Sequence, residues 1–494
     1  MKYDYVVVGG GTAGSVLAAR LTEDRSATVL LLEAGPATAP PAVAVPPAWP
    51  TLLDSPVTWD FRTTPQSGLR GAELPYPRGR LLGGCSCINA MAHTRAHRSS
   101  YDAWGAAGWG YDDLLPYFKR SETAPADRDP AFRGTDGPMR VGPPPRRSAF
   151  AEATLEAARE RGFPETADLN GGEQHGFTWQ EMTIVDGVRQ TAADAYLRPV
   201  RWRANLKVVA DALVTRLVLR DGHCSGVEYR VAGETVVVEA GKSVVLAAGA
   251  IGSPHLLMLS GIGDPAVLGR IGVNTRVKLP DVGRNLQDHP LNGVVFEAPH
   301  PIPVGVNNHG DLIAALRSTP DLEAPDVLLM FLDIPFVRPP LAGPANGYTI
   351  VFSYLRPRSR GSVTLVSADP TVAPAVDPAL LDDPRDIEGM LAALRIAREA
   401  GSATALKEWR QSEALPGSSY EDIDFLRSGT GTFFHAVGTC AIGSVVDSDL
   451  RVQGVSGLRV ADASVMPAII GAPTNATVLA IAERAADLLR GRVS

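Results

Sequence analysis

The segment that decides the fold is the first fourteen residues, which read Met1-Lys2-Tyr3-Asp4-Tyr5-Val6-Val7-Val8-Gly9-Gly10-Gly11-Thr12-Ala13-Gly14. Its apolar first half predicts a buried β-strand, and its glycines predict a tight turn into a helix that includes Ser15 to Leu21. A second apolar run, Ala27 to Leu32, ends at Glu33. That acid lies at the distance of roughly 20 residues that is typical of a dinucleotide-binding unit. Strand, turn, helix, strand and acid therefore follow one another in the expected order.

Each part of this unit has a physical role toward a dinucleotide. Gly9 and Gly11 allow the tight turn and the close approach of a pyrophosphate, and Gly14 allows the helix to pack closely on the strand. The helix N-terminus offers free N–H groups and a positive dipole end to the phosphates. A carboxylate at Glu33 is placed to bind unphosphorylated ribose. We therefore expect seven residues of this unit to contact the cofactor: Gly9, Gly11, Thr12, Ala13, Gly14, Glu33 and Ala34.

The length and composition of the chain limit the number of domains, the kinds of partner and the cellular location that can be expected. With 494 residues the chain exceeds the size of a single core, so two domains are expected. The net charge of −7 argues against a nucleic-acid partner and an anionic membrane surface. No apolar run of about 18 residues predicts a membrane span, and no leader precedes the first strand, so we expect a cytoplasmic protein. The four cysteines are too scattered for a disulfide framework, and we expect no metal site.

Hydrophobic patterns divide the rest of the chain into two kinds of segment. Strand-like runs occur at 205–219, 226–230, 236–238, 243–250 and 458–462, and shorter runs at 293–296, 327–331, 348–352 and 362–365 follow proline-rich turns. Helical patterns occur at 148–162, 384–400 and 476–490, and we expect a further helix to start after Pro254. We read the first group as a parallel sheet, and the shorter runs as a separate antiparallel sheet.

These patterns predict an α/β protein, with a Rossmann-like dinucleotide-binding domain around a parallel sheet. A substrate domain with an antiparallel β-sheet flanked by helices is inserted into it. The nucleotide domain is predicted to comprise residues 1–145, 200–290 and 430–494, and the substrate domain residues 146–199 and 291–429.

Five further segments make the chain recognisable. They are Gly79 to Ala90 (GRLLGGCSCINA), Gly249 to Gly263 (GAIGSPHLLMLSGIG), Asp281 to His289 (DVGRNLQDH), His435 to Cys440 (HAVGTC) and Leu458 to Pro467 (LRVADASVMP). In kind, order and spacing this set resembles the glucose–methanol–choline (GMC) flavoprotein oxidoreductases, and the resemblance covers nearly the whole chain.

The resemblance implies an FAD enzyme that oxidises a primary alcohol to the aldehyde. In this family a histidine follows a short aromatic stretch, as His435 follows Phe433-Phe434 here. A histidine or asparagine lies about forty residues further on, where this chain has Asn475. Hydride removal requires that the hydroxyl proton also leaves, and imidazole is the side chain whose ordinary pKa lies nearest neutrality. We expect His435 to take that proton while the hydride goes to flavin N5, and Asn475 to hold the substrate oxygen by its amide N–H groups.

The same resemblance extends the list of residues expected at the cofactor. Glycines beside the isoalloxazine permit close backbone approach, and the residue at Val214 pairs with the adenine through its backbone. Asp462 ends a strand where cofactors gather, although a helix cap explains it nearly as well. The loop that carries covalent FAD in some members has no histidine here, so we expect non-covalent FAD. These further residues are Arg80, Gly83, Gly84, Cys85, Asn89, Ala90, Ala92, Val214, Ala248, Asp462, Ala463 and Thr477.

Three other histidines invite interpretation. His93 and His97 have the i, i+4 spacing of a zinc pair, but no Glu follows His93 and arginines surround both. We therefore expect a surface role for the pair. His289 closes one of the five segments, and we interpret it as structural, at the junction of the two domains.

The substrate and the electron acceptor are less determined. We expect pocket residues among the aromatics Trp59, Phe61, Trp179, Phe331, Phe352, Phe433 and Phe434, with Asp333 or Glu181 as a carboxylate if the substrate is a quaternary ammonium. A modest, partly apolar alcohol, aromatic or furanic, is preferred. Oxygen, a quinone or a redox protein could accept the electrons, and the protein could be a monomer or a homodimer. Three alternatives remain: a flavin-containing hydroxynitrile-lyase-like enzyme, an NAD-dependent dehydrogenase and a non-catalytic FAD-binding protein.

Overall fold

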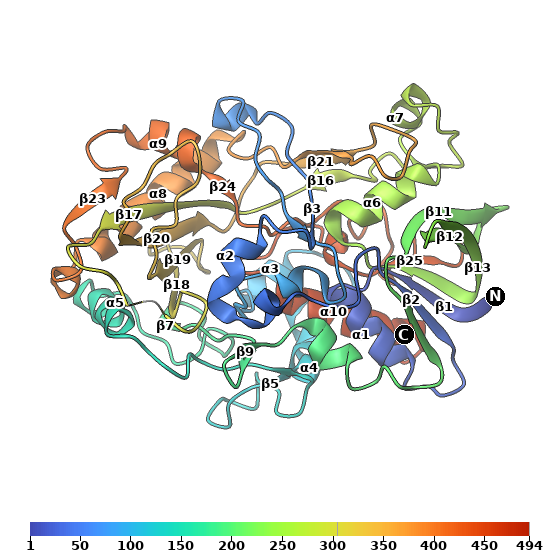
Figure 1. Cartoon of the computed structure of the whole chain (residues 1–494), viewed down its shortest axis with the longest axis horizontal. Coiled ribbons are helices and arrows are strands. Elements are labelled where there is room, and N and C mark those ends of the chain that lie inside the picture. Colours follow the sequence, from blue (N-terminus) through green and yellow to red (C-terminus); the bar gives the residue numbers. More distant parts are fainter. Residues whose placement is uncertain (304, 494) are drawn as a thin grey trace.

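The computed structural model describes residues 1–303 and 305–493, and within them two seven-stranded sheets lie toward opposite ends of the long axis (Figure 1). The first sheet, with β1 at one edge of the view, contains strands from the beginning, middle and end of the chain (Figure 1). The second is built mainly from residues 290–354 and lies at the other end. The predicted fold class is confirmed; the domain boundaries stay a prediction.

The first sheet has the order β10-β2-β1-β13-β12-β11, with β25 paired to β13. The strands β10 (Leu206–Val209), β2 (Val29–Leu32), β1 (Lys2–Val8), β13 (Glu234–Leu246) and β25 (Leu458–Val460) run parallel to their neighbours. Valines fill the last three positions of β1, and valine and leucines fill all of β2, because both faces of a parallel sheet are covered.

This sheet is mixed rather than purely parallel. The run predicted at 236–238 and the first half of the run predicted at 243–250 form one strand, β13, which ends at Leu246. The charged residues between them, Glu239 and Lys242, are exposed and do not interrupt the strand. The first half of β13 pairs antiparallel with β12 (His223–Val231), which pairs with β11 (Leu213–Arg220). One long strand therefore belongs both to the parallel sheet and to an antiparallel extension.

Helices α1 (Thr12–Leu21), α10 (Asn475–Leu489) and α4 (Tyr111–Ser121) pack together beside the first sheet. Helix α6 (Gly249–Leu259) starts five residues before Pro254, so the predicted start was wrong. Pro254 has no N–H to donate to the carbonyl of Ala250, and that carbonyl instead accepts a hydrogen bond of 2.6 Å from Thr439 Oγ1. A side chain from elsewhere in the fold thus makes the proline tolerable inside the helix.

The second sheet is antiparallel, with the order β23-β17-β20-β19-β18-β7 and β24 paired to β17. Helices α5 (Ala149–Glu160) and α8 (Pro384–Gly401) occur where helical patterns were predicted, and α8 packs on the sheet. The strands are β7 (Gly176–Trp179), β17 (Pro290–Glu297), β18 (Leu312–Leu316), β19 (Val327–Leu332), β20 (Gly347–Tyr354), β23 (Ser412–Leu415) and β24 (Gly431–Thr432).

One predicted strand of this sheet lies elsewhere. The run 362–365 forms β21 (Gly361–Thr364), which pairs with β16 (Arg284–Leu286) and β22 (Ala375–Asp377) in a three-stranded sheet of its own. Its alternating pattern identifies a strand but carries no information on the partner, which depends on contacts with distant segments.

Short elements connect these layers, and several lie between the two sheets (Figure 1). They are α2 (Trp49–Leu52), β3 (Thr58–Trp59), β4 (Arg78–Gly79), α3 (Arg98–Asp102), β5 (Glu122–Thr123), β6 (Met139–Arg140), β8 (Ile184–Val185), β9 (Val188–Arg189), β14 (Ile262–Gly263), α7 (Pro265–Arg270), β15 (Val277–Lys278) and α9 (Asp422–Gly429). Every helix in the described part of the chain is too short or too polar to cross a lipid bilayer.

Candidate active site

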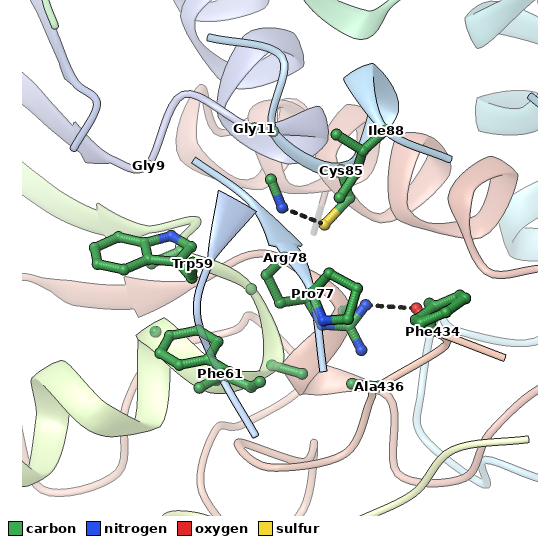
Figure 2. A pocket seen from close by; sticks show the side chains of 18 of the residues that line it. Gly9, Gly11, Trp59, Phe61, Pro77, Arg78, Cys85, Ile88, Phe434 and Ala436 are labelled. Atoms are coloured by element: carbon green, nitrogen blue, oxygen red, sulfur yellow. Dashed lines mark hydrogen bonds between the residues drawn. The ribbon is translucent and has the colours of Figure 1, made fainter. Parts of the chain in front are cut away.

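A single cavity of about 480 Å³ runs from the glycine turn after β1 to the inner face of the antiparallel sheet. Gly9 and Gly11 line one part of it, and Phe434 and Ala436 another (Figure 2). Its walls come from both sheets and from the loops between them, so neither sheet forms the site alone.

The turn after β1 has the geometry that was expected of a nucleotide-binding loop. Gly9 has φ +101°, and a Cβ at Gly14 would lie 1.8 Å from the Gly9 carbonyl oxygen, so both positions require glycine. The first turn of α1 faces the cavity, and Gly11 at its N-cap offers no side chain to occupy the free N–H groups. The structure thus presents a helix N-terminus to the cavity, as an anionic pyrophosphate requires.

Glu33 lies in the wall of the cavity with both oxygens engaged. Oε2 accepts from the N–H of Gly10 at 2.7 Å, and Oε1 from the N–H of Gly35 at 2.8 Å. Burial raises the pKa of its carboxyl to about 7, although these N–H donors oppose the shift. The carboxylate therefore braces the glycine turn and also reaches the cavity.

A second glycine loop closes on the first. A Cβ at Gly84 would lie 2.7 Å from the Cα of Gly11, so the two loops touch through glycine alone. Buried Arg189 donates to the backbone oxygen of Asn89 at 2.6 Å and to its Oδ1 at 2.8 Å, which holds this loop in place.

Most of the residues expected at the cofactor line this cavity, and four do not. Gly14 packs α1 on β1, Gly83 donates its N–H to the Gly10 carbonyl at 2.8 Å, and buried Thr477 bonds Tyr101 at 3.0 Å. Arg80 lies over the ring of Trp59. The lining residues are Gly9, Gly11, Thr12, Ala13, Glu33, Ala34, Gly84, Cys85, Asn89, Ala90, Ala92, Val214, Ala248, Asp462 and Ala463.

Asp462 is a fully engaged cap. Its carboxylate accepts from the N–H of Gly249 at 2.8 Å, from Ser253 Oγ at 2.5 Å and from the N–H and hydroxyl of Ser464. Burial raises the pKa of this carboxyl, and the four donors oppose the shift. Because the side chain holds the start of α6, only its backbone is available to a ligand.

His435 lines the other part of the cavity. Its ring stacks on Phe433 at 4.4 Å between centroids, and its backbone N–H donates to Asp288 Oδ1 at 2.8 Å. Asp288 also accepts from Tyr76 Oη at 2.6 Å and from Thr432. Burial lowers the pKa of the imidazole well below its ordinary value, and the nearby His289 and Arg78 act in the same direction. The ring is therefore neutral at ordinary pH and able to accept a proton.

Two groups touch this histidine segment from outside. His289 Nδ1 lies 3.0 Å from His435 Nδ1, so His289 contacts the candidate base; its structural role at the domain junction stays a prediction. Arg78 donates to the Phe434 carbonyl at 2.5 Å, as Figure 2 shows, and its Nη2 is buried without a partner in the described structure.

Asn475 begins α10 and meets the start of α1. Its Oδ1 accepts a hydrogen bond of 3.1 Å from Thr12 Oγ1, and both residues line the cavity. The contact ties the amide to the glycine turn and leaves its N–H₂ group as the donor.

The seven candidate aromatics divide into two groups. Trp59, Phe61, Phe433 and Phe434 line the cavity, and the first two stack with their rings 5.6 Å apart (Figure 2). Phe331 and Phe352 belong to the core beneath α8, and Trp179 packs against it. Successive side chains of a strand point to opposite faces, so Phe331 faces the core while its neighbours Met330 and Leu332 face the cavity.

The surface role expected for the histidine pair was wrong for His93, and neither candidate carboxylate reaches the cavity. His93 is buried and its Nε2 lies 3.0 Å from Glu122 Oε2, while the ring of His97 caps α3. Neither Glu181 nor Asp333 lines the cavity: Glu181 pairs with Arg133 at 2.6 Å, and Asp333 with His309 at 2.6 Å. The described residues contain no group of three or more His, Cys, Asp or Glu side chains arranged for a metal ion.

Comparison with known proteins decides the family. Models described as GMC oxidoreductase match residues 3–291 and 357–482. The chain belongs to the GMC oxidoreductase family. It is 38% identical to the mitochondrial choline dehydrogenase of Homo sapiens, over 99% of this chain and 90% of that one. It resembles the crystal structure of pyridoxine 4-oxidase from Mesorbium loti with a TM-score of 0.95 and 38% identity, and each chain is covered completely. It also resembles the structure of a fungal aryl-alcohol oxidase, with a TM-score of 0.88 and 26% identity, and 99% of each chain is covered.

Membership establishes that this GMC oxidoreductase is a flavoprotein that acts on CH–OH groups, and FAD is the cofactor expected of the family. The residues present fit that group. The helix N-terminus, the contact between the Gly11 and Gly84 loops and the carboxyl of Glu33 lie where the two phosphates and the ribose of a dinucleotide need them.

Sequence reasoning missed several lining residues of this GMC oxidoreductase. Arg78 stands immediately before the recognised Gly79 segment and could have been included with it. Met330 and Leu332 could have been found by alternation once β19 was assigned to a two-sided sheet. For Trp49, Phe336 and Pro473 no local signal distinguishes a lining residue from a core residue, because their place depends on how distant loops meet.

Proposed function

We propose that this protein oxidises a primary alcohol to the aldehyde, with His435 as the base and Asn475 as the group that positions the substrate oxygen. The supporting observation is that one cavity is lined both by the glycine turn of a dinucleotide site and by a neutral, buried imidazole. FAD, when bound, supplies the two-electron acceptor that takes the hydride from the carbinol carbon at flavin N5.

The residues divide the remaining work between them. His435 takes the hydroxyl proton as the C–H bond breaks, which avoids a protonated carbonyl product. Asn475 presents its amide N–H groups, because Thr12 already occupies its Oδ1. Phe433 stacks on the imidazole and limits its rotation. Leu291, Met330 and Val351 contribute apolar surface that excludes water from the reacting atoms: all three line the same cavity.

We further propose that FAD is held without a covalent bond. Ile88 lines the cavity in the loop where some family members carry a histidine, and an alkyl side chain cannot attack a flavin. Cys87 in the same loop is buried, and burial raises the pKa of its thiol to about 12, so it is not a thiolate at neutral pH. Denaturation should release all of the yellow colour into the protein-free supernatant; colour retained on the precipitated chain would contradict this proposal.

The wall beside His435 favours a neutral aromatic alcohol. Trp59, Phe61 and Phe434 supply aromatic surface to the cavity. The cation Arg78 donates to the Phe434 carbonyl and lowers the pKa of His435, whereas the carboxylate Asp60, which also lines the cavity, is exposed to solvent. A cation beside His435 disfavours a quaternary ammonium substrate. The likeness to pyridoxine 4-oxidase makes pyridoxine one candidate among aromatic primary alcohols.

An anaerobic screen that follows flavin bleaching tests this proposal without a choice of acceptor. Benzyl alcohol, furfuryl alcohol and pyridoxine should reduce the flavin faster than choline does. If choline is the fastest of the four, the assignment of the substrate class fails. If the flavin stays oxidised with every alcohol while a hydroxynitrile releases cyanide, the reaction is the lyase reaction instead.

Replacement of the two catalytic candidates separates their roles. His435→Ala should retain FAD and reduce it roughly 10² to 10⁴ times more slowly, the usual contribution of a general base. Asn475→Ala should slow reduction while FAD affinity changes little. A large loss of FAD affinity with an unchanged reduction rate would show that Asn475 serves the cofactor through Thr12 and not the substrate.

A further inference from the structure

His289 lies directly behind the candidate base and does not reach the cavity. It is fully buried, its Nδ1 faces His435 Nδ1 at 3.0 Å, and it is absent from the cavity wall. The two rings are nearly perpendicular, with an interplanar angle of 88° and centroids 5.2 Å apart. A hydrogen bond between two imidazole nitrogens requires that one carries the proton and the other is bare.

The other nitrogen of His289 decides which one is bare. His289 Nε2 lies 3.3 Å from the carbonyl oxygen of Leu355, and a carbonyl can only accept. Nε2 of His289 therefore carries a proton. Burial lowers the pKa of His289 to about 4, so the ring is neutral and holds only that one proton above this pH. Its Nδ1 is then a bare acceptor, and His435 Nδ1 must be the donor.

The geometry points to His289 as a positioning residue that fixes the tautomer of His435: the Leu355 carbonyl orients His289, and His289 holds the proton of His435 on Nδ1. This leaves Nε2 of His435 as the bare nitrogen that meets the substrate hydroxyl. The inference rests on the proposed function, in which the O–H bond breaks, an Nε2–H bond forms, and the electron pair of the C–H bond leaves as hydride to the acceptor named above.

The fixed tautomer matters because an imidazole with its proton on Nε2 cannot act as a base through that nitrogen. Without His289, the buried Nδ1–H of His435 would lack a partner, so the tautomer with its proton on Nε2 would be favoured. The remaining charged or titratable groups near His435 do not substitute for it. Asp288 is occupied by the backbone N–H of His435, and Arg78 can only donate.

The ¹⁵N spectrum of histidine-labelled protein measures the tautomer directly. The chain has nine histidines, and the His435→Asn variant identifies the signals of His435 by their loss. In the FAD-loaded wild-type protein, His435 should show a protonated Nδ1 and a bare Nε2. A bare Nδ1 in that spectrum overturns the inference, whatever any variant does.

Two substitutions at His289 test the consequence for the reaction. His289→Phe keeps the ring volume but removes the acceptor, so it should shift His435 to the tautomer with its proton on Nε2 and slow flavin reduction by roughly 100-fold. His289→Asn, whose Oδ1 can take the place of Nδ1, should restore most of the rate and the wild-type ¹⁵N pattern. His223→Phe, at an exposed histidine that bonds Ser456, is the control for loss of an imidazole.

The outcomes separate this inference from the proposed function. If His289→Phe keeps the wild-type ¹⁵N pattern of His435, reduction rate and pH profile while His435→Ala slows reduction as expected, His435 is the base and His289 is only structural. If His435→Ala reduces as fast as the wild-type protein, the proposed function itself fails. Should His289→Phe not fold, the wild-type spectrum and His289→Asn still decide.

Discussion

Single residues in this protein carry roles that depend on what their buried atoms contact. Glu33 and Asp462 are both buried carboxyls beside the same cavity, and both accept hydrogen bonds from backbone N–H groups. Asp462 also accepts from two serine hydroxyls, so its four contacts leave little capacity for a ligand. Within the described part of the chain, Glu33 accepts from two backbone N–H groups, and so it retains acceptor capacity for ribose hydroxyls.

Glu33 should make the stability of the apoprotein depend on pH. Burial raises the pKa of its carboxyl from 4.5 to about 7 in the folded state. Between these values the unfolded chain releases the proton and the folded chain keeps it, so folding stability falls as pH rises toward 7 and then levels off. Relative to Glu33→Gln, the wild-type apoprotein should lose on the order of 3 kcal/mol over this range. Urea unfolding at pH 4.5 to 8 measures this difference, and parallel curves for the two proteins would contradict it.

At the scale of elements, the site depends on two close approaches of secondary structure. α1 packs on β1 through Gly14, and the Gly11 and Gly84 loops touch without side chains between them. A β-carbon at these positions would meet backbone, which cannot move aside as a flexible side chain can.

Gly14→Ala should therefore be severely destabilising. The added Cβ would lie 1.8 Å from the Gly9 carbonyl oxygen, so α1 would have to shift away from β1 and widen the nucleotide turn. We expect a loss of several kcal/mol, above about 4, together with loss of bound flavin. The matched control is Gly269→Ala in α7, where a Cβ meets nothing within 4 Å and helix propensity favours alanine by about 1 kcal/mol. Thermal melts and flavin content measure both variants; similar behaviour of the two would refute the packing argument.

Adjacent residues of β19 should have separable effects. Phe331→Ala removes a ring from the core beneath α8 and should lower the free energy of unfolding by about 3 to 5 kcal/mol, with little change in substrate preference. Met330→Ala enlarges the cavity wall and should change the relative rates with small and bulky alcohols at a smaller cost in stability. Denaturant titration and the anaerobic alcohol screen give the two readouts, and a reversal of the two phenotypes would show that the faces of β19 are misassigned.

At the scale of the whole molecule, the cavity joins the two sheets. Its lining includes Val8 and Leu32 of the first sheet and Leu291 and Val351 of the second. A ligand in this cavity contacts both layers at once, so its binding energy adds to the stability of the native arrangement.

FAD should stabilise the folded chain, and other nucleotides should not. At a free concentration of 100 times Kd, a ligand that binds only the native state adds about 2.7 kcal/mol. Thermal melts of the apoprotein with FAD, with NAD and with FMN measure this effect. A rise in Tm with NAD but not with FAD would favour the dehydrogenase that uses nicotinamide.

The sequence alone determined the parts of this protein that depend on local order. Each of these parts can be recognised from a turn, a hydrophobic period or a motif that lies within a few residues. They are the turn after β1, Glu33, the helices α5, α8 and α10, and the position of His435 after two phenylalanines. The family resemblance, carried by longer motifs, was confirmed by the comparisons.

Only the tertiary structure decided which distant residues meet. The contact of His289 with His435, the tie between Thr12 and Asn475 and the early start of α6 join residues more than 140 positions apart. Tertiary structure also decided which face of β19 reaches the cavity and to which sheet β21 belongs. A local pattern indicates that a side chain is buried or that a strand forms. The residues or strand that it contacts depend on the packing of the whole chain, and no local pattern contains that information.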